Sequence, residues 1–171
     1  MKRIYTGIIL IAIMILSACG GKKADDPITK IELGMTLEQA LEAEPELTVY
    51  EGKGYSCSKS YADAEGTMLI SLSPFDGDNS VFTVLWQLDP TDGNGKSVYD
   101  KLFSDLKNAY GKPRISNDKT DVESVTGIHD EAQALWEFKD YTVSCSYIEY
   151  PESGKCQIQY KRGKTTDNLK F

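Results

Sequence analysis

The feature that most constrains the fold is a pattern that the chain shows twice: a capped helical segment, then several short segments of alternating residues. In the first copy Thr36 and Gln39 form a capping box, and Pro45 ends the predicted helix. In the second copy Ser97 is the expected N-cap, with Asp100 three residues later, and apolar residues recur at helical spacing as far as residue 110. Both segments are therefore predicted to be amphipathic helices.

Period-two alternation predicts strands after each helix. The expected strands cover residues 55–61, 67–73, 81–88, 134–139, 141–150 and 155–161, and the polar stretch 117–131 is expected to be a long loop. The order predicts an α+β fold of two similar halves, each a helix followed by antiparallel strands, with the helices packed on one face of the sheet. We expect the first half to span residues 28–93, the second 94–162, and a loose tail 163–171.

The first eighteen residues have the features of a secretory signal rather than of a folded element. Lys2 and Arg3 precede an apolar run over residues 4–16. The run is shorter than the about 20 residues that a membrane-spanning helix needs, and it fits the apolar region of a signal peptide. An ordinary signal peptide and an uncleaved anchor are the two alternatives at this point.

The segment Leu16-Ser17-Ala18-Cys19 resembles the lipobox of bacterial lipoproteins. The resemblance implies cleavage between Ala18 and Cys19, a diacylglycerol group on the sulfur of Cys19, and often an acyl chain on its amino group. Two or more chains anchor a protein stably, whereas one does not. Residues 19–27 would then be the lipidated cysteine and a flexible polar tether. The protein is thus expected to be extracytoplasmic and lipid-anchored to the bacterial cell membrane, or to the outer membrane if the organism has one.

A second resemblance concerns the two helices. Gly34-Met35-Thr36-Leu37-Glu38-Gln39-Ala40 resembles the Gly-Met-Thr-x-x-Gln-Val helix opener of small bacterial lipoproteins, namely the outer-membrane small protein A group and relatives of β-lactamase inhibitor protein. Tyr110-Gly111-Lys112-Pro113 resembles the Leu-Gly-x-Pro that ends such a helix. The resemblance implies helices on one face of an antiparallel sheet, in some members in tandem. The first helix lacks the closing glycine and the second lacks Met-Thr, so neither enzyme inhibition nor outer-membrane assembly is carried over.

Three cysteines remain once Cys19 is assigned to lipid, so at most one internal disulfide forms. If the turn at 151–154 sets the register of its hairpin, Cys156 lies opposite about Glu149 and too far along the strand from Cys145 for a bridge. Two alternatives stay open. One is a disulfide from Cys57 to Cys145 or to Cys156, and the other is three buried thiols that act as small apolar side chains.

Short catalytic motifs occur but lack their context. Gly93-Asn94-Gly95-Lys96-Ser97 resembles the end of a P-loop, but Pro90 stands where the first glycine belongs and has no N–H for a phosphate. Ser104 and Lys107 match S-x-x-K, but the serine falls in the middle of the predicted helix, and the partner motifs are missing. We therefore expect no catalytic residues and no enzyme.

Acidic turns and a single histidine are the remaining candidates for metal binding. The turns contain Asp76, Asp78 and Asn79, and Asp89, Asp92 and Asn94, without the spacing of a calcium loop. His129 has no nearby cysteine or second histidine and is expected to be solvated in a loop. We expect no metal site and no cofactor other than the lipid on Cys19.

The net charge of −7, with no dense basic block, excludes nucleic acid as the expected partner. Trp86 and Trp136 lie in predicted strands and are expected in the core, whereas some tyrosines could line an exposed sheet face. The sequence therefore predicts a protein- or peptide-binding module of the cell envelope. The first alternative is an inhibitor or regulator of a secreted enzyme, and the second is an enzyme or a small-ligand or metal-binding protein.

Overall fold

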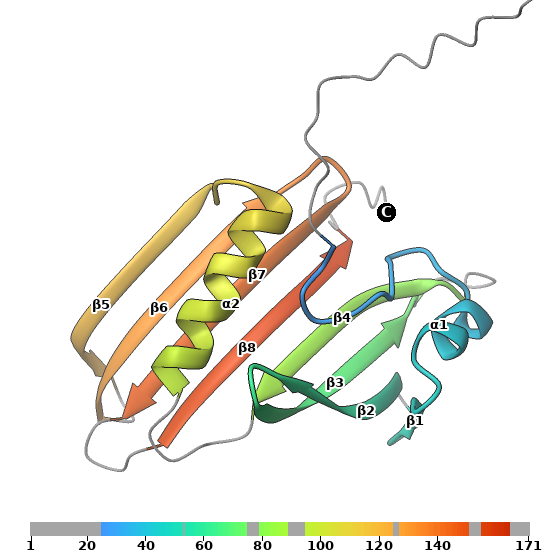
Figure 1. Cartoon of the computed structure of the whole chain (residues 1–171), viewed down its shortest axis with the longest axis horizontal. Coiled ribbons are helices and arrows are strands. Elements are labelled where there is room, and N and C mark those ends of the chain that lie inside the picture. The colour runs from blue at the N-terminus through green and yellow to red at the C-terminus, as the bar shows by residue number, and fades with distance from the viewer. Residues whose placement is uncertain are drawn as a thin grey trace, which may run out of the picture.

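A computed structural model describes residues 25–52, 54–74, 79–88, 95–124, 127–150 and 155–164 (Figure 1). The signal segment, the lipobox, the turn at 151–154 and most of both acidic turns lie outside the described residues. The helices are α1 (Leu37–Ala43) and α2 (Gly95–Tyr110). The strands are β1 (Thr48–Tyr50), β2 (Gly54–Tyr61), β3 (Ala64–Leu72), β4 (Val81–Leu88), β5 (Ile115–Ser124), β6 (Gly127–Glu137), β7 (Tyr141–Tyr150) and β8 (Lys155–Lys164).

All eight strands form one antiparallel sheet in the order β1-β2-β3-β4-β8-β7-β6-β5. The decisive pairing is β4 with β8, which runs from Thr83 opposite Gly163 to Leu88 opposite Ile158. It joins strands that follow α1 to strands that follow α2. The molecule is thus one continuous sheet (Figure 1).

The prediction of an α+β fold in two halves is wrong. Helices precede both runs of strands, but the strands do not form separate helix-covered units, and strand dominates the described chain. α1 has only seven residues, of which only Ala40 is buried. The sequence could not show that β4 pairs with β8. The two strands pair through backbone hydrogen bonds, and these leave no pattern in the side chains.

Two of the helix signals are confirmed and one is wrong. The hydroxyl of Thr36 accepts from the N–H of Gln39, whose side chain accepts from the N–H of Thr36, so the capping box is present. Gly111 has a φ of +82° and ends α2, and its N–H donates to the carbonyl of Lys107. α2 begins at Gly95, so Ser97 lies inside the helix and is not its cap.

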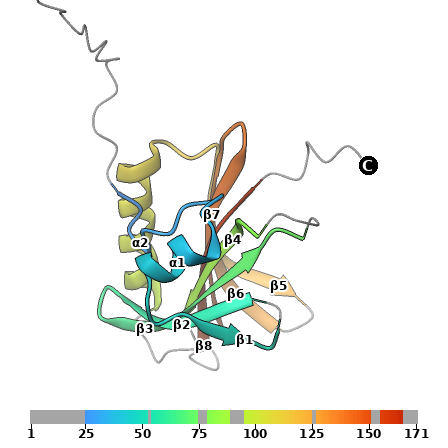
Figure 2. The ribbon, with the colours of Figure 1, turned by 90° about the vertical axis from the view of Figure 1, so that its right-hand side faces the viewer.

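The core lies between the sheet and α2. Tyr99 packs on Tyr147 of β7, and Phe103 packs on Trp136 of β6, with ring centroids 5.7 and 6.1 Å apart. Trp86 and Trp136 are both buried, as predicted. Figures 1 and 2 show α1 on the same side of the strands as α2.

Two strands were missed from the sequence. β1 and β5 are the edges of the sheet, and the expected loop at 117–131 is instead most of β5 and the start of β6. β5 consists mainly of polar and charged residues. An edge strand needs backbone partners on one side only, so it forms without the apolar alternation of a central strand. None of the described helices is long and apolar enough to cross a membrane.

Candidate functional site

The side of the sheet away from the helices carries a surface that we call the open face. It consists of alternate residues of the four central strands, whose neighbours in sequence point into the core. Its described members are Glu65, Thr67, Leu69 and Ser71 on β3, Thr83, Leu85 and Gln87 on β4, Gln157, Gln159 and Lys161 on β8, and Thr142, Ser144, Ser146, Ile148 and Tyr150 on β7. None of these side chains is buried, and no described helix packs on them (Figure 2).

The open face is polar but nearly uncharged. Glu65 and Lys161 are the charged residues among these described members, and the others are hydroxyl, amide, leucine, isoleucine and tyrosine side chains. Leu69 and Leu85 lie directly opposite each other on β3 and β4 and form a small apolar centre. A surface of short donors and acceptors around half-buried leucines resembles the mixed chemistry of protein–protein interfaces.

The size of the sheet also matches a protein partner. Eight strands spaced about 4.8 Å apart, at about 3.3 Å per residue, give one whole side of the sheet of roughly 30 by 30 Å, on the order of 900 Å². The four central strands that carry the open face supply about half of this area. A standard interface takes about 800 Å² from each partner. The whole side of the sheet is therefore large enough for a folded protein.

A second feature is a buried polar cluster that holds the N-terminal segment, made of Asp26, Tyr110, Tyr160 and Arg162. Oδ2 of Asp26 accepts from both phenol hydroxyls at 2.5 Å and lies 3.3 Å from Nη1 of Arg162. Oδ1 accepts from the N–H groups of Ile28 and Thr29 at 2.9 and 3.1 Å. We call this the Asp26 cluster. It joins the segment after the tether to α2 and β8, and so the tether ends before Asp26 rather than at residue 27.

Charge within the Asp26 cluster is balanced. Burial disfavours the charged form of Arg162, but the oxygens of Tyr160 and Asp26 outweigh it and raise the pKa of the guanidinium. Burial, reinforced by the Asp26 carboxylate, raises the pKa of both Tyr110 and Tyr160 above the ordinary range. At neutral pH both phenols therefore stay protonated and donate to Asp26.

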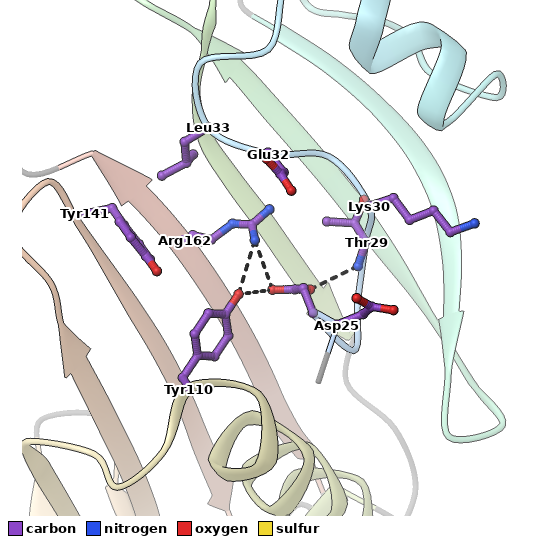
Figure 3. Close-up of a pocket in the computed structure, with 9 residues that line it drawn as sticks. Asp25, Thr29, Lys30, Glu32, Leu33, Tyr110, Tyr141 and Arg162 are labelled. Carbon is purple, nitrogen blue, oxygen red and sulfur yellow. Dashed lines mark hydrogen bonds and ion pairs between the residues drawn. The ribbon is translucent and has the colours of Figure 1, made fainter. Parts of the chain in front are cut away.

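A pocket of about 610 Å³ lies beside this cluster, between the N-terminal segment and the ends of α2, β7 and β8. Figure 3 shows Tyr141 on one side and Asp25 and Lys30 on the other, with Arg162 between Leu33 and Tyr110. Both terminal nitrogens of Arg162 are already engaged, by Asp26, Tyr110 and the carbonyl of Ile31. Its Nε has no partner among the described residues and is buried. The guanidinium therefore fixes the chain rather than receiving a ligand.

The structure brings none of the sequence candidates that lie among the described residues into a catalytic group. Ser104 is exposed on α2, and Lys96 pairs with Asp100 at 2.6 Å. His129 is a correction: it is buried on β6, beside the ring of Tyr150 and 3.5 Å from Glu131, and not solvated in a loop. Among the described residues no group of His, Cys, Asp and Glu is placed to hold a metal ion.

The cysteines and tyrosines lie largely on the helix side. Cys57, Cys145 and Cys156 form no disulfide, so neither expected bridge from Cys57 is present, and Cys156 lies opposite Glu149 as expected. The tyrosines Tyr61, Tyr99, Tyr147 and Tyr160 are buried. The expectation of a tyrosine-bearing binding face is wrong for these four, because their rings fill the core under α2 and the N-terminal segment.

Sequence reasoning missed both main features of the surface. Period-two alternation over residues 55–61 predicts a strand, but the joining of β4 to β8, which makes the open face wide, leaves no signal in the sequence. Asp26 was assigned to the tether because polar residues precede it. Comparison with known proteins gives no further guide, since no family model, curated protein or solved structure matches this chain.

Proposed function

We propose that this protein is a lipid-anchored extracytoplasmic binding module, which takes another folded envelope protein onto its open face. The single observation that carries the proposal is the open face itself. It is a wide sheet surface that no described element covers, with an apolar centre at Leu69 and Leu85 and two charged side chains of opposite sign, Glu65 and Lys161, among its described members.

The chemistry of the open face indicates the kind of partner. Because the hydroxyl and amide groups both donate and accept, they match a neutral polar surface better than a charged one. A small ligand would leave most of this surface wet, whereas a protein surface covers it. The lipid on Cys19 would hold the module at the membrane and raise its effective concentration for a partner in the same layer.

Site-specific photo-cross-linking in the source bacterium tests the proposal. A photoreactive residue replaces Ser144 or Gln159 on the open face, and matched controls carry it at Ser104 or Asn108, which are exposed on α2. We expect one protein adduct from the open-face positions and none from the controls. Ser146→Arg should abolish the adduct, and Asn108→Arg should leave it. Equal adducts from both sides of the molecule would reject the open face.

The anchor has its own test. Intact mass spectrometry of the purified protein should show loss of residues 1–18 and the added mass of the lipid on Cys19. Cys19→Ala should release the protein from the membrane fraction. A full-length, unmodified chain would contradict the lipoprotein proposal without bearing on the open face.

A further inference from the structure

The Asp26 cluster decides how far the domain can stand from a membrane. Because Asp26 is fixed to α2 and β8, only five residues, 20–24, lie between the lipidated Cys19 and the fixed chain at Asp25, which makes six steps from Cα to Cα. Six such steps extend to at most about 22 Å. The end of the domain that contains Asp26 therefore stays within that distance of the lipid surface.

This end can be defined from the contacts. Tyr110, the last residue of α2, contacts Asp26 and lies 5.9 Å from the ring of Phe138 in the turn between β6 and β7. The first residue of β7, Tyr141, lies opposite Lys164, the last residue of β8. We call this region the anchored end. Figure 1 shows the end of α2, the β6–β7 turn, the tip of β8 and the N-terminal segment grouped together.

The anchored end is rich in exposed basic side chains. Lys107, Lys112 and Arg114 line an open hollow of about 620 Å³ beside Phe103 and Pro113. Lys30 and Lys139 are exposed nearby. The carboxylates Asp25, Glu32, Glu137 and Asp140 share this end, and Glu137 is paired with Arg114.

The opposite end of the same strands has the reverse charge. It carries the carboxylates Asp121, Glu123, Asp130, Glu131 and Glu149, with Lys119 paired to Glu131 at 2.9 Å. Other lysines, such as Lys101 and Lys119, lie away from the tethered end, but basic side chains outnumber carboxylates at that end and carboxylates predominate at the other. The tethered end is therefore attracted to an anionic surface and the opposite end is repelled by it.

We propose that the anchored end lies against anionic lipid headgroups, with the hollow lined by Lys107, Lys112 and Arg114 facing the headgroup phosphates. This inference rests on the lipid anchor of the proposed function. The axes of strands β7 and β8 would then point away from the membrane. The open face would stand upright and meet partners from the side.

Lysine footprinting of the mature protein tests this orientation. The protein, with its lipid verified by intact mass, is reconstituted in vesicles of phosphatidylcholine alone or with about a third of anionic phosphatidylglycerol. An amine-reactive ester labels exposed lysines, and peptide mapping gives the rate at each site. We expect labelling of Lys30, Lys112 and Lys139 to slow roughly threefold or more on the anionic vesicles, and high salt to reverse it. Lys101 and Lys119 should be unaffected.

Charge-reversal variants provide the matched control. The double variant Lys112→Glu/Lys139→Glu should restore fast labelling of Lys30 on anionic vesicles. The double variant Lys101→Glu/Lys119→Glu changes the net charge equally and should not.

The orientation would be overturned if anionic vesicles changed the labelling rate of all these lysines equally, or if they protected only Lys101 and Lys119. Protection produced by inorganic phosphate on neutral vesicles would do so as well, by showing a phosphate site and not a membrane contact. An unlipidated protein would refute the anchor, whereas a lipidated protein without protection would refute only this inference.

Discussion

A single carboxylate, that of Asp26, organises the N-terminal segment. It accepts two backbone N–H groups and two phenol hydroxyls and neutralises a buried arginine. Removing the Asp26 carboxylate leaves the charge of Arg162 buried without its partner. Breaking a buried ion pair in this way costs about 3–5 kcal/mol of stability. We therefore expect Asp26→Ala to lower the free energy of unfolding by that amount in urea denaturation.

Two further variants separate charge from packing at this position. Asp25→Ala removes an exposed neighbouring carboxylate and should change the free energy of unfolding by less than about 0.5 kcal/mol. Asp26→Ala combined with Arg162→Met removes both charges and should cost less than the sum of the two single changes. Additive losses, or equal losses at Asp25 and Asp26, would contradict the buried pair.

Cys145 makes a pH-dependent contribution to stability. Burial, opposed in part by a hydrogen bond with Tyr99, raises the pKa of its thiol to about 12, from about 9. The protonated Cys145 thiol therefore contributes its full stabilisation of the folded state below pH 9. Between pH 9 and 12 this contribution to the free energy of unfolding falls by up to about 1.4 kcal/mol per pH unit. The difference in unfolding free energy between the wild type and Cys145→Ala should be smaller at about pH 10 than at about pH 8.

Val143→Ala is the matched control for this measurement, because Val143 is buried on the same strand and does not titrate. The difference in unfolding free energy between Val143→Ala and the wild type should be the same at both pH values. A Cys145→Ala difference that is also constant with pH would show that the thiol keeps its ordinary pKa.

At the scale of elements, local chemistry was predictable and long-range pairing was not. The capping box at Thr36, the end of α2 at Gly111 and the central strands follow from residues close in sequence. The β4–β8 pairing, the polar edge strand β5 and the burial of Asp26 depend on residues far apart. The open face could not be predicted because it exists only once β4 and β8 are joined.

The start of α2 shows why a local motif misled. The sequence predicts that Ser97 caps the helix, whereas α2 begins at Gly95, which packs against β7 and β8. A Cβ at Gly95 would overlap Sγ of Cys156 and lie 3.1 Å from the ring of Tyr147. The glycine therefore allows the helix to approach the sheet closely. This contact, and not the capping signal at Ser97, decides where the helix begins.

We accordingly expect Gly95→Ala to lower the free energy of unfolding by about 1–3 kcal/mol, although alanine favours helix more than glycine does. Ser104→Ala, at an exposed position of α2, should be neutral or slightly stabilising. Adding Cys156→Ala to Gly95→Ala should recover part of the loss, since it removes the overlapping sulfur. Thermal or urea unfolding monitored by circular dichroism measures all three, and a neutral Gly95→Ala would reject the close approach.

At the scale of the whole molecule, one sheet implies one cooperative unit. The buried core is a single cluster that includes Met68, Ile70 and Trp86 as well as Trp136, Val143 and Tyr147. Tyr61 of β2 also donates to Asp105 of α2 at 2.7 Å, so the strands after α1 are tied to the second helix. Neither set of strands is therefore expected to stay folded when the other unfolds.

The two tryptophans make this testable, because Trp86 lies on β4 and Trp136 on β6. Trp86→Phe leaves a fluorescence reporter only in the strands after α2, and Trp136→Phe leaves one only in the strands after α1. In each variant the urea midpoint from fluorescence should agree with the midpoint from circular dichroism of the same variant. Both substitutions remove buried aromatic volume, so each variant is compared with itself and not with the wild type. If the fluorescence transition of either variant separates from its circular dichroism transition, the pairing of β4 with β8 does not couple the sheet, and the open face would be two smaller surfaces able to move independently.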